Sequence, residues 1–286
     1  TPMTSPAPEV VPNGAASTQP ASPTSPPSRA PTADSVPATP EGGASDEQLE
    51  GSTLTFDLGL GSAYMWRGAN LWGNRTSTQH LSLFPSVTYA NGNFSALYWG
   101  AYQLTGKNKG DNLDAGAGAE QDLGVSYELP VGEQLSALFA LTAYVWPLAK
   151  KDVAGANWPA ALEPGVTLSY ETKADLALFV GYYRGLQDAT DAFSHVYLNP
   201  QIGKELELTD TLTLNLAAGA GYKIWTSSAG QDADENDFDL LGNVGVTYTR
   251  GDLYVTPAMH ASWTDIEGQS TALWGTVNVG YGVALR

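Results

Sequence analysis

The stretch LTFDLGL, residues 54–60, alternates large apolar side chains with small or polar ones. Its leucines and its phenylalanine occupy every second position, and Thr55, Asp57 and Gly59 occupy the positions between them. Successive side chains of a β-strand point to opposite faces of the sheet, so this pattern predicts a strand with one apolar and one polar face.

The same alternation recurs along the rest of the chain, in segments of about nine to fourteen residues. Strands of soluble proteins average about five or six residues, whereas a tilted strand needs about nine to eleven to cross a bilayer. The sequence therefore predicts an all-β fold, a twelve-stranded antiparallel transmembrane β-barrel. The further segments are 81–89, 94–102, 122–129, 134–146, 162–170, 175–183, 196–208, 212–225, 238–248, 253–263 and 273–285.

The connections between these segments alternate in length. Short ones such as ANGN (90–93), PVGE (130–133) and RGD (250–252) take turns with long polar ones such as 105–121 and 226–237. Short turns on one side and long loops on the other are typical of outer-membrane barrels. An even number of strands would place both ends of the barrel on the short-turn side.

Aromatic residues gather near both ends of the expected strands, as in the aromatic belts of membrane barrels. Four tyrosines precede short turns, and further aromatic residues lie near the long loops. We expect all of them to face the lipid headgroups: Tyr89, Tyr127, Tyr170 and Tyr248 at one interface, and Tyr64, Trp66, Trp225 and Trp263 at the other.

Composition narrows the function. The 286 residues carry a formal net charge of −17, which argues against binding to nucleic acid. Cysteine is absent, which excludes disulfides and thiolate metal sites. No apolar run approaches the roughly 18 residues of a membrane helix. The three histidines lack the spacing of zinc ligands, and we expect neither a metal nor a cofactor.

Residues 1–50 differ from the rest of the chain, since they contain many prolines, serines, threonines and alanines but few large apolar side chains. Such a segment buries too little surface to fold alone. We expect a linker or docking arm over 1–50, in the periplasm, and the outer-membrane barrel over 51–286. The opening TPMTSPAPEV is typical of a mature form cut from a precursor. Candidate partners are outer-membrane lipid and lipopolysaccharide for the barrel, and a protein or peptidoglycan for the arm.

One family resemblance rests on the end of the first strand, where Tyr64, Trp66, Arg67 and Gly68 form a Tyr-x-Trp-Arg-Gly pattern. Together with LYWGAY (97–102) and YVWP (144–147), this pattern resembles the gcw-type conserved hypothetical proteins of Gram-negative outer membranes. The resemblance extends over residues 53–185. It implies an outer-membrane barrel and assigns no substrate.

If the apolar positions face lipid, the polar positions line the lumen. Acidic side chains outnumber basic ones in this lining, which favours a narrow porin-like channel for small cationic or neutral solutes. The alternative is a structural barrel filled by a polar network, whose arm docks a partner or the cell wall. The expected lumen-lining residues are Asp57, Arg67, Asp122, Glu128, Glu163, Asp175, Glu205, Lys223, Asp239 and His260.

Two motifs could carry other chemistry. His260 and Ser262 share a strand face, as a base and its nucleophile would, but the parity of this strand turns His260 toward the lumen, so we expect no enzyme. The loop over 230–239 resembles the first half of a calcium loop, although Asp237 stands where glycine is expected and the final glutamate is missing.

Arg67 stands between two tryptophans, Trp66 and Trp72, in GSAYMWRGANLWG (61–73). On the barrel hypothesis it points into the lumen mouth, and we expect it to neutralise Glu120, Asp122 or Asp239.

Overall fold

The structure is a computed structural model that describes residues 51–70, 81–105, 118–145, 160–191, 193–226, 236–266 and 271–285. The expected arm over 1–50 lies outside these ranges. Within them, no helix has the length and apolar character to cross a membrane.

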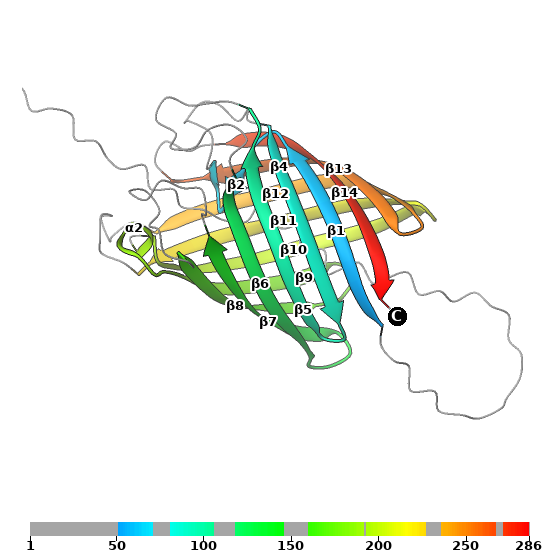
Figure 1. Cartoon of the computed structure of the whole chain (residues 1–286), viewed down its shortest axis with the longest axis horizontal. Helices are drawn as coiled ribbons and strands as arrows, with labels where there is room; N and C mark the ends of the chain where they lie inside the picture. Colours follow the sequence, from blue (N-terminus) through cyan, green and yellow to red (C-terminus); the bar gives the residue numbers. More distant parts are fainter. Residues whose placement is uncertain are drawn as a thin grey trace, which may run out of the picture.

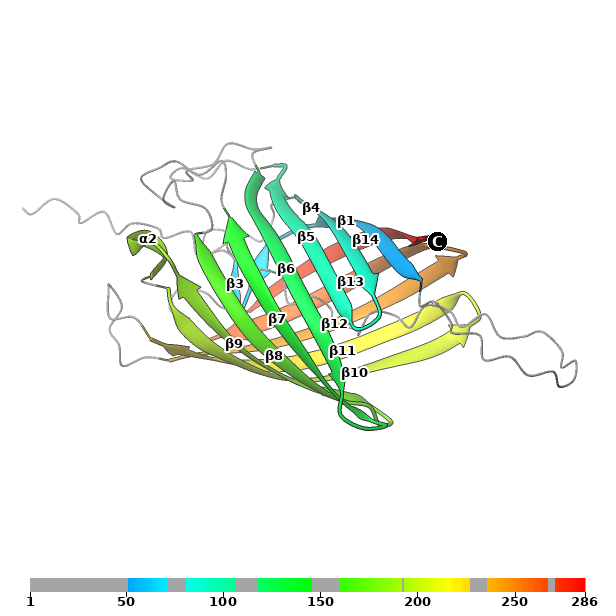
Figure 2. The ribbon, with the colours of Figure 1, turned by 60° about the horizontal axis from the view of Figure 1, so that its bottom comes forward.

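The described strands form one closed barrel in which neighbours in the chain are neighbours in space (Figures 1 and 2). Its strands are β1 (Ser52–Gly61), β4 (Ser82–Asn91), β5 (Phe94–Gln103), β6 (Gly118–Pro130), β7 (Leu135–Val145), β8 (Ala161–Tyr170), β9 (Asp175–Gly185), β10 (His195–Thr209), β11 (Leu212–Trp225), β12 (Asp237–Arg250), β13 (Leu253–Thr264) and β14 (Ala272–Leu285).

The barrel closes where the first strand meets the last. β1 pairs antiparallel with β14 from Ser52↔Leu285 to Gly61↔Thr276, and β1 also pairs with β4. Closure satisfies the backbone hydrogen bonds of both edge strands, which an open sheet in lipid leaves exposed. The prediction of a twelve-stranded antiparallel transmembrane barrel is confirmed.

The outer face is apolar, as the period-two alternation requires. Aliphatic side chains such as Leu58, Val125, Leu141, Val244 and Val279 stand exposed on it. A soluble protein rarely exposes a continuous apolar surface of this extent, whereas a barrel presents one to lipid.

Two rows of aromatic side chains flank this apolar band. Tyr127, Tyr170 and Tyr248 are exposed next to the short turns, and Tyr89 lies on the outward parity of β4. Near the long loops, Trp263 is 43% exposed. Side chains of this kind suit the two membrane interfaces.

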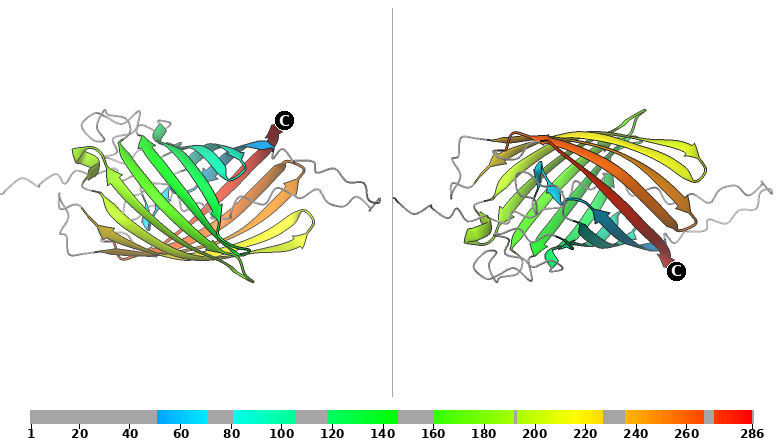
Figure 3. Two further views of the ribbon diagram at one scale, coloured as in Figure 1. Left: turned by 90° about the horizontal axis from the view of Figure 1, so that it is seen from below. Right: turned by 90° about the horizontal axis from the view of Figure 1, so that it is seen from above.

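Two short strands and a short helix lie apart from the wall. β2 (Met65–Trp66) and β3 (Ala69–Asn70) pair with each other in a two-stranded hairpin, and α2 (Asp188–Asp191) sits at the loop end of β9. Both views of Figure 3 place β2 and β3 inside the ring of strands. We call residues 62–70 the inner hairpin.

The orientation of the wall predicts how it tolerates charge. Val125→Lys, at the middle of β6 on the outer face, should cost about 2–4 kcal/mol of unfolding free energy in a bilayer. Ser126→Lys, one residue further and facing the interior, should cost about 1 kcal/mol, through loss of the bond between the Ser126 and Ser95 hydroxyls. Urea titration of vesicle-folded protein measures both, and equal costs would contradict the assignment of faces.

Candidate functional site

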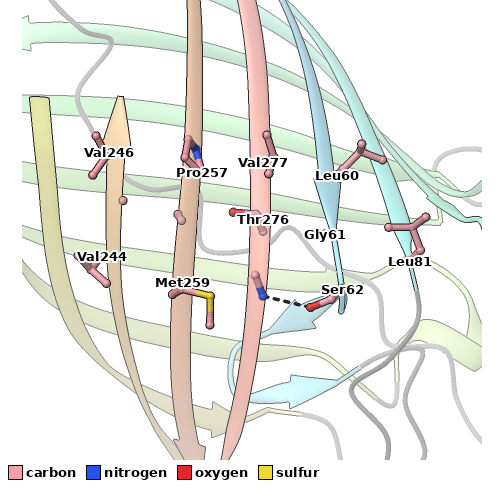
Figure 4. A pocket seen from close by; sticks show the side chains of 13 residues that line it. Leu60, Gly61, Ser62, Leu81, Val244, Val246, Pro257, Met259, Thr276 and Val277 are labelled. Atoms are coloured by element: carbon pink, nitrogen blue, oxygen red, sulfur yellow. Dashed lines mark hydrogen bonds between the residues drawn. The ribbon is translucent and has the colours of Figure 1, made fainter. Parts of the chain in front are cut away.

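The chain leaves the barrel wall at Ser62. Its backbone N–H donates to the carbonyl of Gly275, and the N–H of Gly275 donates to the Ser62 hydroxyl, each at 3.0 Å. Figure 4 shows the bond to the Ser62 hydroxyl beside an apolar groove on the outer surface, between Leu60, Met259 and Val277. The groove faces lipid, whereas the residues that follow Ser62 turn into the lumen.

A tight turn reverses the chain inside the barrel. Trp66 pairs with Ala69, and the two residues between them have positive φ, 41° at Arg67 and 82° at Gly68. Positive φ at both central positions characterises a type I′ hairpin turn, in which the first position usually holds Asn, Asp or Gly. Arginine in this backbone region is strained by about 1 kcal/mol or more, so its side-chain contacts must hold it there.

The inner hairpin spans the lumen from wall to wall. The Tyr64 hydroxyl donates to Glu120 on β6. At the other end, a Cβ on Gly68 would come within 2.8 Å of side-chain atoms of Asp239 on β12 and Thr264 on β13. β6 and β12 are separated by five strands in either direction around the barrel, so they are opposite walls. The hairpin therefore crosses the loop-side half of the lumen.

Arg67 lies at the centre of this arrangement. One guanidinium nitrogen donates to Glu163 on β8, and the other donates to the imidazole of His195 on β10. The guanidinium carbon stands 4.2 Å from the centre of the Tyr197 ring and 4.7 Å from that of Trp66. A buried guanidinium with a carboxylate and two aromatic faces is strongly held.

The surrounding residues fix the groups that Arg67 touches. The Tyr144 hydroxyl donates to the second oxygen of Glu163 at 2.5 Å, and that of Tyr197 donates to Asp239. His195 donates from Nδ1 to the carbonyl of Phe193 at 2.6 Å, which leaves Nε2 as the acceptor for Arg67. We call Glu163, His195 and Tyr197 the guanidinium cage.

A second cation lies nearby. Lys223 on β11 donates to Asp237 at 3.1 Å, and its ammonium is 4.9 Å from the ring of Trp225 and 5.3 Å from that of Trp66. Trp66 thus contacts both cations and also packs on Tyr183 and His195. The buried carboxyl groups Glu120, Asp122, Glu163 and Asp239 still outnumber the buried cations of the described interior.

Apolar contacts hold the remaining sides of the inner hairpin. Tyr64 packs with Trp99 and Ala101 of β5, and Met65 packs with Ala272 and Trp274 of β14. The hairpin is consequently part of the core and not a surface loop.

The structure places the expected lumen-lining residues on the inner face of the wall or, for Arg67, within the lumen. Those of the loop-side half are buried around the inner hairpin: Arg67, Asp122, Glu163, Lys223 and Asp239. The others are more accessible: Glu128, Asp175 and Glu205 toward the short turns, and Asp57 and His260 further along their strands.

Three of the expected belt residues face the interior instead. Tyr64 and Trp66 are 1% and 3% exposed, because the chain leaves β1 at Gly61 and the strand parity ends there. Trp225 shares the inward parity of Lys223 and packs edge-on against His195 at 5.3 Å. The prediction that these three face lipid headgroups is wrong. Tyr222, on the outward parity, is the exposed aromatic residue at this end of β11.

The expected partner of Arg67 is also different. Arg67 points into the lumen, but its ion pair is with Glu163 and not with Glu120, Asp122 or Asp239. Glu120 instead accepts from Tyr64. Tyr144, Tyr183 and His195 complete the cluster, and sequence analysis missed their role. The one available signal was that each lies at an inward position near the loop end of its strand.

The other two motifs do not assemble a site in the described residues. His260 bonds to the Thr276 hydroxyl at 2.9 Å and stacks on Trp274, and the Ser262 hydroxyl is buried without a hydrogen-bond partner. Most of the candidate calcium loop lies outside the described residues. At its end, Asn236 donates to Tyr222, and Asp237 accepts from Lys223.

Gly68 allows a sharp test of the inner hairpin. Gly68→Ala adds a Cβ at positive φ and within 2.8 Å of two wall side chains, so it should cost about 2–5 kcal/mol of unfolding free energy. Gly251→Ala is the matched control, because Gly251 has φ +60° but open space around the added Cβ. It should cost about 1–2 kcal/mol. Equal costs in urea titrations would show that Gly68 is not packed against the wall.

These features define the class of the protein. A closed antiparallel barrel with an apolar outer face, aromatic residues toward both rims and a polar interior is a transmembrane barrel of the outer-membrane type.

Comparisons with solved structures find similar proteins. The chain is similar to the COG4313 outer membrane channel from Pseudomonas putida F1, with a TM-score of 0.54 and 12% identity over 84% of this chain and 100% of that one. It is also similar to the KdgM porin, with a TM-score of 0.47 and 11% identity over 80% of this chain and 98% of that one. At these identities the likeness is one of fold.

Searches of family models and of curated proteins give no match. The resemblance to the gcw-type family is therefore without support beyond the shared outer-membrane barrel.

Proposed function

We propose that this protein is an outer-membrane channel for small cationic or neutral solutes, and that the inner hairpin closes its loop-side half. The observation that carries the proposal is a polar, acidic lumen crossed by a segment that is tied to the wall by hydrogen bonds and an ion pair as well as by apolar contacts.

The turn-side half of the lumen supports the preference for cations. Glu128, Asp175 and Glu205 lie on the inward parity of their strands near the short turns. Asp57 lies deeper and accepts from the Tyr254 hydroxyl. A lumen lined by carboxylates attracts cations and repels anions, most strongly at low ionic strength.

The polar contacts between the inner hairpin and the wall support a hairpin that can withdraw and open the lumen. Water can solvate the polar groups of these contacts once the hairpin moves. The contacts are the hydrogen bonds of Tyr64 with Glu120 and of Arg67 with Glu163 and His195. A plug held only by apolar packing would expose those surfaces to water on opening, at a larger cost.

The proposed location is the outer membrane of a Gram-negative bacterium, with lipid and lipopolysaccharide around the barrel. Ser52 pairs with Leu285 at the end of the barrel that carries the short turns. In outer-membrane barrels these turns are periplasmic, so the arm over 1–50 would start in the periplasm.

The extent of the inner network favours a second candidate, a structural barrel whose arm docks a partner protein or peptidoglycan. Deleting residues 1–50 tests this candidate. If the arm docks the barrel to a partner protein or to peptidoglycan, the shortened protein should no longer co-purify with it. Unchanged co-purification would remove this candidate.

The channel is tested by ion selectivity in planar bilayers under a salt gradient. The wild-type reversal potential should indicate cation preference, and Glu128→Gln/Asp175→Asn/Glu205→Gln should shift it toward zero. Glu171→Gln, in an exposed turn, is the control and should leave it unchanged. Anion preference would contradict the proposed solute class, and absence of conductance even without the inner hairpin would contradict the channel.

A further inference from the structure

The side chain of Arg67 occupies a site that has the composition of a receptor for an organic cation. The guanidinium lies between the faces of Tyr197 and Trp66, at 4.2 and 4.7 Å from the ring centres. Glu163 and the Nε2 atom of His195 accept its hydrogen bonds. Paired aromatic faces with a carboxylate are how proteins bind guanidinium and quaternary ammonium groups.

Most of this site belongs to the wall and not to the inner hairpin. Glu163 comes from β8, and His195 and Tyr197 come from β10, while Tyr144 on β7 holds the second oxygen of Glu163. Only Trp66 belongs, with Arg67, to the inner hairpin. Withdrawal of the hairpin would leave a wall with a carboxylate, a neutral imidazole acceptor and an aromatic ring, all preorganised for a guanidinium.

The charged neighbours of the cage have partners of their own. Lys223 is engaged with Asp237, and Asp239 accepts from Tyr197, so these neighbours do not neutralise Glu163. A buried carboxylate without its cation is costly. As long as water is excluded from the cage, Glu163 therefore requires either Arg67 or another cation.

We propose that the guanidinium cage is the solute site of the channel, that its solutes are small organic cations bearing a guanidinium group, and that Arg67 occupies the site in place of a solute when the hairpin closes the lumen. This inference rests on the proposed function in one respect, since the bound cation is a transported solute only if the protein is a channel. The binding of the cation to the cage does not depend on conduction. A solute that competes with Arg67 for Glu163 would favour the withdrawn hairpin, since a ligand shifts a conformational equilibrium by its differential affinity.

The test is chemical rescue of Arg67→Ala. Methylguanidinium should raise the thermal unfolding midpoint of this variant by about 4 °C at about ten times its dissociation constant. The same concentration should not raise the unfolding midpoint of the wild type, because Arg67 fills the cage. Arg67→Ala/Glu163→Gln should show no rise, since its cage lacks the carboxylate. Urea, neutral and of similar shape, should give no rise in any of the three.

A rise with urea, an equal rise in the double variant or no rise in Arg67→Ala would each overturn the proposal. If Arg67→Ala does not fold, the variant with a Gly–Ser linker in place of residues 63–70 replaces it. Ligand-observed NMR should then show methylguanidinium binding that Glu163→Gln abolishes in the same background. Because these readouts measure binding, a barrel that binds methylguanidinium but never conducts would refute the channel and leave the cage intact.

Discussion

A variant in which a short Gly–Ser linker replaces residues 63–70 is expected to conduct several-fold more current per channel than the wild type. The inner hairpin joins β6 to the opposite walls β12 and β13, so its removal clears the loop-side half of the lumen. The inner wall that remains is polar and can be solvated. Single-channel recording in planar bilayers measures the effect.

The matched control replaces turn residues 131–134 by a linker of the same kind. This turn lies at the rim, outside the lumen, and conductance should not change. A hairpin-deleted barrel that folds, as judged by circular dichroism, yet conducts like the wild type would show that residues 63–70 do not obstruct the lumen.

Arg67→Leu is expected to reduce the unfolding free energy by about 3–5 kcal/mol, because it leaves the Glu163 carboxylate buried without its cation. The side chains of Arg67 and Glu163 are 8% and 4% exposed, so solvent screens the loss only weakly. The guanidinium also holds Arg67 in its positive φ, so the hairpin turn loses its restraint. Urea titration of vesicle-folded protein measures the difference.

The double variant Arg67→Leu/Glu163→Leu supplies the control. Removing both charges should recover most of the stability, since a buried ion pair is often no better than apolar residues of similar volume. Arg184→Leu breaks the exposed ion pair with Asp191 and should cost less than about 1 kcal/mol. If Arg67→Leu were as stable as the double variant, the buried Glu163 carboxylate would not need the Arg67 guanidinium for its stability.

The wall of the barrel was predictable from the sequence because its signal is local. A strand such as 54–60 shows its two faces through alternation alone, and the short turns fix which strands pair. Val125 and Asp122, three residues apart, fall on opposite faces for this reason, and the structure places them so.

The inner hairpin was not predictable in the same way. Because β1 ends at Gly61, the alternation no longer indicates which later side chains face inward. Tyr64 and Trp66 are also of the residue types that form a membrane belt. An aromatic side chain serves equally at a lipid interface and in a packed interior. Only the three-dimensional path of residues 62–70 distinguishes the two.

The partner of Arg67 illustrates the same limit of local patterns. Inward parity correctly directs Arg67 toward the lumen, but Glu163 is 96 positions away in the chain. Its strand meets Arg67 only because the hairpin reaches across the barrel. The residues of the cage therefore come together only in the closed barrel, and no sequence motif marks them.

Photo-cross-linking through methionine tests the central claim, that residues 62–70 lie inside the barrel. The described residues hold Met65, which is 5% exposed and packs with Ala272 and Trp274, and Met259, which is 55% exposed on the outer face. With photo-methionine at both positions and the protein in bilayers, mass spectrometry should find Met65 joined to the peptides of β12 or β14 and Met259 joined to lipid. Lipid adducts at Met65 comparable to those at Met259 would contradict the account.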